Sequence, residues 1–301
     1  MSHSSPDALQ QRCQQIVTSP VLSPEQKRHF LALEAENNLP YPALPEAARA
    51  ALDEGFICDM FEGHAPYKPR YVLPDYAKFL ANGSEWLELE GAKDLDDALS
   101  LLTILYHHVP SVTSMPVYLG QLDALLQPYV RILTQEEINS RIKRFWRYLD
   151  RTLPDAFMHA NIGPEDTPVT RAILRADAEL KQVAPNLTFI YDPAITPDDL
   201  LLEVAKNICE CSKPHISNGP VNDKIFTKGH YGVVSCYNSL PLAGGGSTLV
   251  RLNLKAIAEH STSMEDVFSR ALPHYCQQQM AIIDARCDFL YQQSGFFENS
   301  F

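Results

Sequence analysis

The 301 residues carry 37 acidic against 25 basic side chains, with a formal net charge of −12. Because binding to a nucleic-acid backbone requires clustered Lys and Arg side chains, this balance argues against nucleic acid as a partner. No apolar run approaches the roughly 18 residues of a membrane span, and the first residues lack the apolar core of a signal peptide. We therefore expect a cytoplasmic protein with no membrane partner.

Helices separated by proline-rich connections are predicted for the first half of the chain. Two capping boxes, in which Ser or Thr precedes Gln or Glu by three residues, predict helices over about 24–37 and 135–150. The boxes are Ser23 with Gln26 and Thr134 with Glu137. A short helix is expected from Pro45 to a stop at Gly55, and apolar spacing predicts another over 94–109 that ends at Pro110. We expect residues 1–184 to form a mostly helical region.

Strands and helices alternate from residue 186 onward. Residues 187–191 read as a short apolar strand, Thr196, Pro197 and Asp199 as the cap of a helix to about Cys211, and residues 247–254 as a strand. Such alternation is typical of parallel strands joined by crossover helices, so residues 185–301 are predicted as a second region. Its last segment, 263–293, is predicted as a helix with one buried apolar stripe. That stripe contains Cys276, Met280, Ile283, Cys287 and Leu290.

A single cysteine, Cys236, lies on a predicted loop between extended segments. Its neighbours are Val, Ser, Tyr and Asn, and none of them is a cation that would favour a thiolate. A neutral thiol that loses a hydrogen atom to become a thiyl radical suits this setting better than an ionised nucleophile. From these residues alone, an inert buried cysteine is the more common interpretation. Gly244 to Gly246 lack the following Lys of a phosphate-binding loop, so we interpret them as a tight return of the chain.

Three blocks in order resemble the YjjI family of glycyl radical enzymes. They are PNLTF at 185–189, PHISNGP at 214–220 with Asn222 and Asp223 just after, and GVVSC at 232–236. The sequence STLVRLNLKAIA at 247–258 is similar to the segment after the active cysteine in anaerobic ribonucleotide reductases. The resemblance to the YjjI family covers essentially the whole chain.

The resemblance implies both a fold and a set of site residues. The expected fold is α/β, with an N-terminal helical layer and half of a ten-stranded barrel of the glycyl radical enzyme type. Cys236 would be the catalytic residue on a loop that reaches into the barrel, and four other residues would bind substrate. These are Tyr118, Asn218, Tyr237 and Asn238. For Asn218 a role in a turn is equally favoured. We expect no metal site, because His107 and His108 have no partners at ligand spacing.

The same resemblance implies partners that lie outside the chain. A separate radical S-adenosylmethionine activating enzyme would install the glycyl radical, and the substrate would be a small molecule, with a homodimer as a further option. The radical glycine of the family lies in an ArgValXaaGly loop, which does not occur among the 13 glycines here. We therefore expect an N-terminal portion of a longer enzyme, inactive alone, that binds no cofactor itself.

At two positions the sequence differs from other glycyl radical enzymes in ways that argue against particular reactions. Three alternative functions of the chain stay open. Asn238 stands where diol dehydratases have a glutamate, and an amide cannot take up a proton at neutral pH. Cys236 has no adjacent cysteine, which argues against acyl transfer of the pyruvate formate-lyase type. The alternatives are an anaerobic nucleotide reductase, a non-catalytic binding or regulatory module, and a fragment without independent function.

Overall fold

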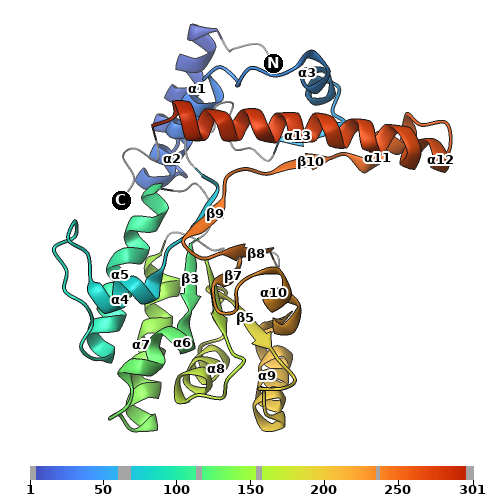
Figure 1. The fold of residues 1–301 in the computed structure, drawn as a ribbon. Helices are drawn as coiled ribbons and strands as arrows, with labels where there is room; N and C mark the ends of the chain where they lie inside the picture. Colours follow the sequence, from blue (N-terminus) through green and yellow to red (C-terminus); the bar gives the residue numbers. More distant parts are fainter. Residues whose placement is uncertain (1–4, 60–68, 113–116, 154–157, 235–237, 296–301) are drawn as a thin grey trace. The chain divides into compact units, whose positions relative to one another are not determined.

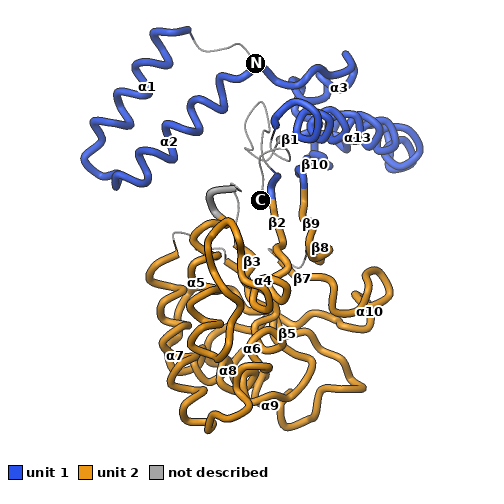
Figure 2. Tube along the Cα trace, turned by 60° about the vertical axis from the view of Figure 1, so that its left-hand side comes forward, with its two compact units in different colours: residues 1–70, 247–300 blue, residues 71–246, 301 orange. Residues whose placement is uncertain are grey.

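The chain divides into two compact units, which we describe separately. The computed structural model describes residues 5–59, 69–112, 117–153, 158–234 and 238–295. Unit 1 comprises residues 1–70 and 247–300, and unit 2 comprises residues 71–246 and 301 (Figure 2). The boundary that we predict between residues 184 and 185 falls within unit 2, and the division into those two regions remains a prediction. Within the described ranges, no helix has the length and apolarity needed to cross a membrane.

Unit 1 is built from helices and one antiparallel strand pair (Figure 1). Its elements are α1 (Pro6–Thr18), α2 (Pro24–Asn37), α3 (Glu46–Asp53), β1 (Ile57–Asp59), β10 (Val250–Leu252), α11 (Leu254–Glu259), α12 (Met264–Asp266), the π-helical η2 (Val267–Ala271), α13 (Leu272–Asp288) and the π-helical η3 (Phe289–Gln293). β1 pairs antiparallel with β10. Ile57 and Val250 of this pair pack against Ile282 of α13 and two alanines of α3.

The segment that we predict as one long helix buries a different face from the predicted stripe. α12, η2, α13 and η3 follow one another without a break, and their buried residues are Ala271, Gln278, Ile282, Arg286 and Leu290. Of the predicted stripe only Leu290 is buried, and Met280 is 54% exposed. The buried face includes polar side chains, such as Arg286 beside the Tyr41 ring, so apolar spacing alone could not reveal it.

Unit 2 contains a four-stranded parallel sheet in the order β3-β4-β5-β6 (Figure 1). Its elements are β2 (Tyr71–Leu73), α4 (Tyr76–Asn82), α5 (Leu95–Val112), β3 (Tyr118–Gln121), α6 (Leu122–Leu126), the 3-10 helix η1 (Gln127–Tyr129), α7 (Gln135–Thr152), β4 (His159–Ile162), α8 (Pro168–Leu180), β5 (Asn186–Tyr191), α9 (Asp198–Cys211), β6 (His215–Asn218), α10 (Gly219–Ile225), β7 (Tyr231–Val234), β8 (Asn238–Pro241) and β9 (Gly244–Gly246). The predicted parallel strands with crossover helices are therefore present, but the alternation begins at β3, earlier than the sequence indicates.

One face of this sheet packs on helices. Ala160 and Ile162 of β4 and Leu187 and Phe189 of β5 are fully buried and belong to the largest core cluster, together with apolar residues of α7, α8 and α9. These alternate strand positions form an apolar face, as expected where helices cover a sheet. The side chains between them must then point to the other face, which we call the inner face.

Helix ends follow the sequence with two exceptions. α5 does not end at Pro110 as predicted but continues to Val112. Both predicted capping boxes form, at Ser23 with Gln26 and at Thr134 with Glu137. The predicted cap of α9 is wrong, because its N-cap residue is Pro197 and no side chain caps the helix. The hydroxyl of Thr196 instead donates a hydrogen bond to the carbonyl oxygen of Pro164, at 3.1 Å.

The glycine triplet forms strand β9, which pairs antiparallel with β2. A Cβ atom added at Gly245 would lie 2.0 Å from the carbonyl oxygen of Tyr71, so only glycine allows the two strands to approach this closely. The triplet therefore serves the packing of the chain, in keeping with its interpretation as a return after the cysteine loop.

Candidate functional site

A β-hairpin brackets the cysteine that the sequence singles out. β7 and β8 pair antiparallel, with Val233 opposite Ser239 and Val234 opposite Asn238. The connection between the strands is residues 235–237, so the predicted site residues Cys236 and Tyr237 lie outside the described residues. Asn238 begins β8 and is exposed. The described structure thus positions both ends of the segment that bears Cys236.

A buried amide of the parallel sheet holds the hairpin on the side away from β8. The Nδ2 atom of Asn161 in β4 donates to the carbonyl oxygen of Val233 at 2.9 Å, and the Val233 N–H donates to Oδ1 of Asn161 at 2.8 Å. Asn161 is fully buried. Because an amide presents a donor and an acceptor side by side, it satisfies both backbone groups of Val233 as a paired strand would.

Tyr118 of β3 supports the same contact. Its hydroxyl donates to Oδ1 of Asn161 at 3.1 Å, and its ring is buried. Burial raises the pKa of Tyr118, so the hydroxyl keeps its proton and remains a donor. A Cβ atom added at Gly232 would lie 2.4 Å from Cζ of Tyr118, so β7 can pass over the ring because residue 232 is glycine. The structure thus brings Tyr118 to the base of the hairpin that carries Cys236.

A second set of hydrogen bonds ties the other strand of the hairpin to β6. Ser239 of β8 donates through Oγ to Oδ1 of Asn222 at 2.9 Å, and Nδ2 of Asn222 donates to Oγ of Ser217 at 3.0 Å. The neighbouring Asn218 is exposed, and its Oδ1 accepts from the Val221 N–H at 3.1 Å as the N-cap of α10. The observed hydrogen bond of Asn218 thus matches the role in a turn that the sequence also allows. Its role in substrate binding remains a prediction.

The inner face of the parallel sheet is polar. Asn161 lies on this face, and the register places Thr188 of β5 beside it and His215 of β6 beside Thr188. His159 lies two residues before Asn161 and so shares its face. Strands buried in parallel sheets are usually apolar on both faces, so this polar composition indicates a functional surface. The sequence signal for this face is the alternation of polar and apolar residues in HANI at 159–162, NLTF at 186–189 and HISN at 215–218. Interpreting residues 187–191 as one apolar strand overlooks this alternation.

A buried carboxyl group lies where β3 ends. Asp123 is 2% exposed and accepts hydrogen bonds from the Gly163 N–H at 2.6 Å, the Thr170 hydroxyl at 2.8 Å and the Ala124 N–H at 2.8 Å. Burial raises the pKa of Asp123 to about 7, although these donors partly oppose the shift. Because its oxygens are engaged in joining the loops after β3 and β4, Asp123 acts as a structural residue.

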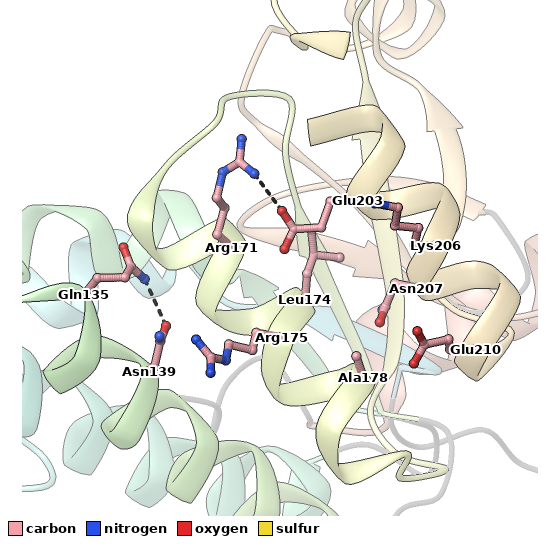
Figure 3. Close-up of a pocket in the computed structure, with 10 residues that line it drawn as sticks. All are labelled: Gln135, Asn139, Arg171, Leu174, Arg175, Ala178, Glu203, Lys206, Asn207 and Glu210. Carbon is pink, nitrogen blue, oxygen red and sulfur yellow. Dashed lines mark hydrogen bonds and ion pairs between the residues drawn. The ribbon is translucent and has the colours of Figure 1, made fainter. Parts of the chain in front are cut away.

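A surface groove of about 440 Å³ lies between α7, α8 and α9 (Figure 3). It contains charged side chains, but Arg171 pairs with Asp166, Asp199 and Glu203, and Arg175 pairs with Glu179. These cations are neutralised by the chain itself, and the groove lies on the helical side of the sheet, away from the hairpin. We therefore place the candidate site at the hairpin and the inner face. Among the residues that the structure describes, no group of three His, Cys, Asp or Glu side chains could hold a metal ion.

Comparison with known proteins identifies relatives over nearly the whole chain. The family model described as "Glycyl radical enzyme YjjI-like" matches residues 22–301. The chain is 89% identical over 301 residues to the Escherichia coli protein YjjI, of which it covers 58%. It is 44% identical over 250 residues, 83% of its length, to an uncharacterized protein of Haemophilus influenzae, of which it covers 48%. The chain thus spans about half the length of these relatives.

Solved structures share the fold at low sequence identity. The anaerobic ribonucleotide reductase from Thermotoga maritima with glycerol in its active site matches with a TM-score of 0.64, over 97% of this chain and 53% of that chain. The same enzyme in complex with dATP and CTP matches with a TM-score of 0.60, over 95% and 53%. Both are 14% identical to this chain, which shows the fold alone. The predicted α/β fold of the glycyl radical enzyme type is confirmed.

Proposed function

Because this chain belongs to the YjjI-like family of glycyl radical enzymes, we propose that Cys236 forms a thiyl radical that abstracts hydrogen from a small-molecule substrate. The observation that carries this proposal is the β7–β8 hairpin. Its strands enclose residues 235–237, and Asn161 fixes its base against the polar inner face. A reactive thiol needs such a rigid support, because hydrogen transfer depends on close and fixed placement of the reacting atoms.

The proposed radical originates outside these residues. No ArgValXaaGly sequence occurs among the 13 glycines of the chain, so the glycyl radical would reside elsewhere in the intact enzyme. A separate activating enzyme would install it with S-adenosylmethionine, and the 301 residues alone would carry no radical. The cytoplasm would be the setting for this oxygen-sensitive chemistry. A homodimer belongs to the same proposal.

The proposed transfer conserves atoms and electrons. The glycyl radical takes a hydrogen atom from the Cys236 thiol, so that the S–H bond breaks and a glycine C–H bond forms. The thiyl radical then takes a hydrogen atom from a substrate C–H bond, which restores the S–H bond and leaves a substrate radical. Neither step requires the thiol to ionise, in keeping with the uncharged residues around Cys236.

The residues proposed to bind substrate differ in whether their side chains already form hydrogen bonds within the chain. The hydroxyl of Tyr118 already donates to Asn161, so Tyr118 would act mainly by supporting the hairpin. Asn238 is exposed at the start of β8, beside the cysteine segment, and is free of such a commitment among the contacts described for it. We therefore propose Asn238 and Tyr237 as the residues nearest to bound substrate, with Asn218 at the neighbouring strand end.

An anaerobic assay of the intact native protein tests this function. After treatment with its activating enzyme and S-adenosylmethionine, the protein should show the doublet electron-spin signal of a glycyl radical. Wild-type protein should then consume a compound in an anaerobic cell extract, detected by mass spectrometry. Cys236→Ala should keep the radical signal and lose this consumption, whereas Cys209→Ala, at an exposed cysteine of α9, should retain both. Absence of the radical, or equal consumption by Cys236→Ala, would contradict the proposal.

The alternatives predict different results in the same extract. A nucleotide reductase would consume added ribonucleotides, and the shared fold at 14% identity does not by itself favour that reaction. A non-catalytic binding module would show no Cys236-dependent consumption and would keep its partner after Cys236→Ser.

A further inference from the structure

His159 is a buried polar side chain in which one ring nitrogen has no hydrogen-bond partner. It lies at the start of β4 on the inner face, opposite Tyr118 of β3 and Asn186 of β5. The residue is 6% exposed, and its Nδ1 atom is buried without a hydrogen-bond partner. Leaving such an atom unsatisfied costs about 1–3 kcal/mol. In native proteins, an unsatisfied buried group of this kind usually has a reason, such as a catalytic role or a bound molecule.

The surroundings of His159 favour an uncharged imidazole. Burial, together with the positive field of His215 when that ring is protonated, lowers the pKa of His159 to about 4. The described strand positions on the inner face contain no Lys or Arg that could hold an anion. They are Tyr118, His159, Asn161, Asn186, Thr188, Ile190, His215 and Ser217. The face therefore offers hydrogen-bonding groups without a Lys or Arg side chain, and one of these groups, Nδ1 of His159, has no partner.

We propose that His159 and His215 form a binding site for the hydroxyl groups of an uncharged, hydroxylated small molecule. A neutral imidazole has one donor and one acceptor nitrogen, and a hydroxyl group can serve either of them. An anion would instead require a cationic partner to offset its desolvation. The inference rests on the proposed function and adds a substrate class to it.

The spacing of the two histidines suits a ligand with several hydroxyl groups. His159 is level with Asn186 on β5, whereas His215 on β6 is level with Thr188, two residues farther along β5. The two histidine backbones are therefore separated by two strand spacings of about 4.8 Å and by two residues of about 3.3 Å along the strands, on the order of 12 Å in all. An extended polyol of about four carbons that forms a hydrogen bond to one ring at each end can bridge a gap of this order.

Equilibrium dialysis of the intact native protein, without activation, tests the site. The probes are radiolabelled erythritol, an uncharged four-carbon polyol, and erythronate, its carboxylate counterpart. Wild-type protein should bind erythritol saturably and more tightly than erythronate. His159→Leu should weaken erythritol binding at least about tenfold, and His215→Leu should weaken it by a smaller factor. The control His107→Leu, on the exposed side of α5, should bind as wild type does.

The outcomes separate this inference from the proposed function. His159→Leu removes an unsatisfied polar atom and should fold, and His159→Gln provides a second variant that keeps hydrogen-bonding groups and should bind between the two. No saturable erythritol binding, tighter binding of erythronate, or equal binding by His159→Leu would each overturn the inference. Because binding is measured without the radical, radical formation with no polyol binding would reject only the inference. Polyol binding without radical formation would reject only the radical function.

Discussion

Replacing Asn161 should release the hairpin that carries Cys236. In Asn161→Leu, the N–H and carbonyl groups of Val233 and the hydroxyl of Tyr118 lose their shared partner. Each buried polar group left unsatisfied costs about 1–3 kcal/mol, so we expect a total loss of unfolding free energy on the order of 3–5 kcal/mol after local relaxation. Most of this loss should appear as local opening of β7, because the three groups meet at Val233 and Tyr118.

Amide hydrogen exchange of the intact protein measures this local opening. If about 3 kcal/mol is lost locally, exchange at the Val233 N–H should accelerate by about a hundredfold, since about 1.4 kcal/mol corresponds to a factor of ten. Asn161→Asp keeps an acceptor for the Val233 N–H but places an oxygen against the Val233 carbonyl group. Burial of that unpaired oxygen is itself unfavourable, so exchange at the Val233 N–H should accelerate in this variant as well.

A matched control separates local from global effects. Asn207 in α9 is also a buried asparagine, and its Nδ2 donates at 3.1 Å to Asp177 of α8, a contact between two helices. Asn207→Leu should lower overall stability without a selective change at Val233. The reasoning would be refuted if Val233 exchange in Asn161→Leu matched wild type, or if Asn207→Leu accelerated it equally.

Three further predictions concern the packing of unit 2. Lys213→Met should lower the unfolding free energy, measured by chemical denaturation, by about 3–5 kcal/mol. Nζ of Lys213 lies 2.7 Å from Oδ1 of fully buried Asp177, so the substitution leaves the negative charge of that carboxylate uncompensated. Adding Asp177→Asn should recover part of the lost free energy. Gly232→Ala should cost about 1–3 kcal/mol through the clash with the Tyr118 ring, with less than half of that cost when Tyr118 is also changed to Leu. Because the pKa of Asp123 is raised in the folded state, its contribution to stability is greatest below about pH 4 and is lost as pH rises to about 7. The difference in unfolding free energy between wild type and Asp123→Asn should therefore change by about 1.4 kcal/mol per pH unit in that range, and a pH-independent difference would contradict the raised pKa.

The elements that local sequence signals define were predictable. Capping boxes at Ser23 and Thr134 and the apolar spacing in α5 and α7 placed those helices within about three residues, because a cap and an amphipathic stripe are properties of residues close together in the sequence. The four-residue strands β3 and β4 were missed, because their stability comes from neighbours distant in the sequence. The buried face of α13 was missed because Gln278 and Arg286 lie on it.

The candidate site was predictable only in part. Ordered sequence blocks pointed to Cys236, and the hairpin around it places Tyr118 at its base as a support. The partnership of Asn161 with Val233 joins residues 72 positions apart, and no local pattern announces such a contact. His159 likewise has no distinctive neighbours in the sequence. Its interest arises from burial and from its unpaired nitrogen, which only a three-dimensional arrangement reveals.

The contacts that hold the β7–β8 hairpin in place do not depend on the residues that connect its two strands. The supports of β7 and β8 within the described residues act on strand positions: Asn161 hydrogen-bonds to Val233, Asn222 hydrogen-bonds to Ser239, and Gly232 fits against the Tyr118 ring. None of these contacts uses residues 235–237, so changes in that triplet leave the anchoring untouched. Residues 235–237, which include the proposed reactive cysteine, could therefore be exchanged while these contacts of the hairpin strands stay the same.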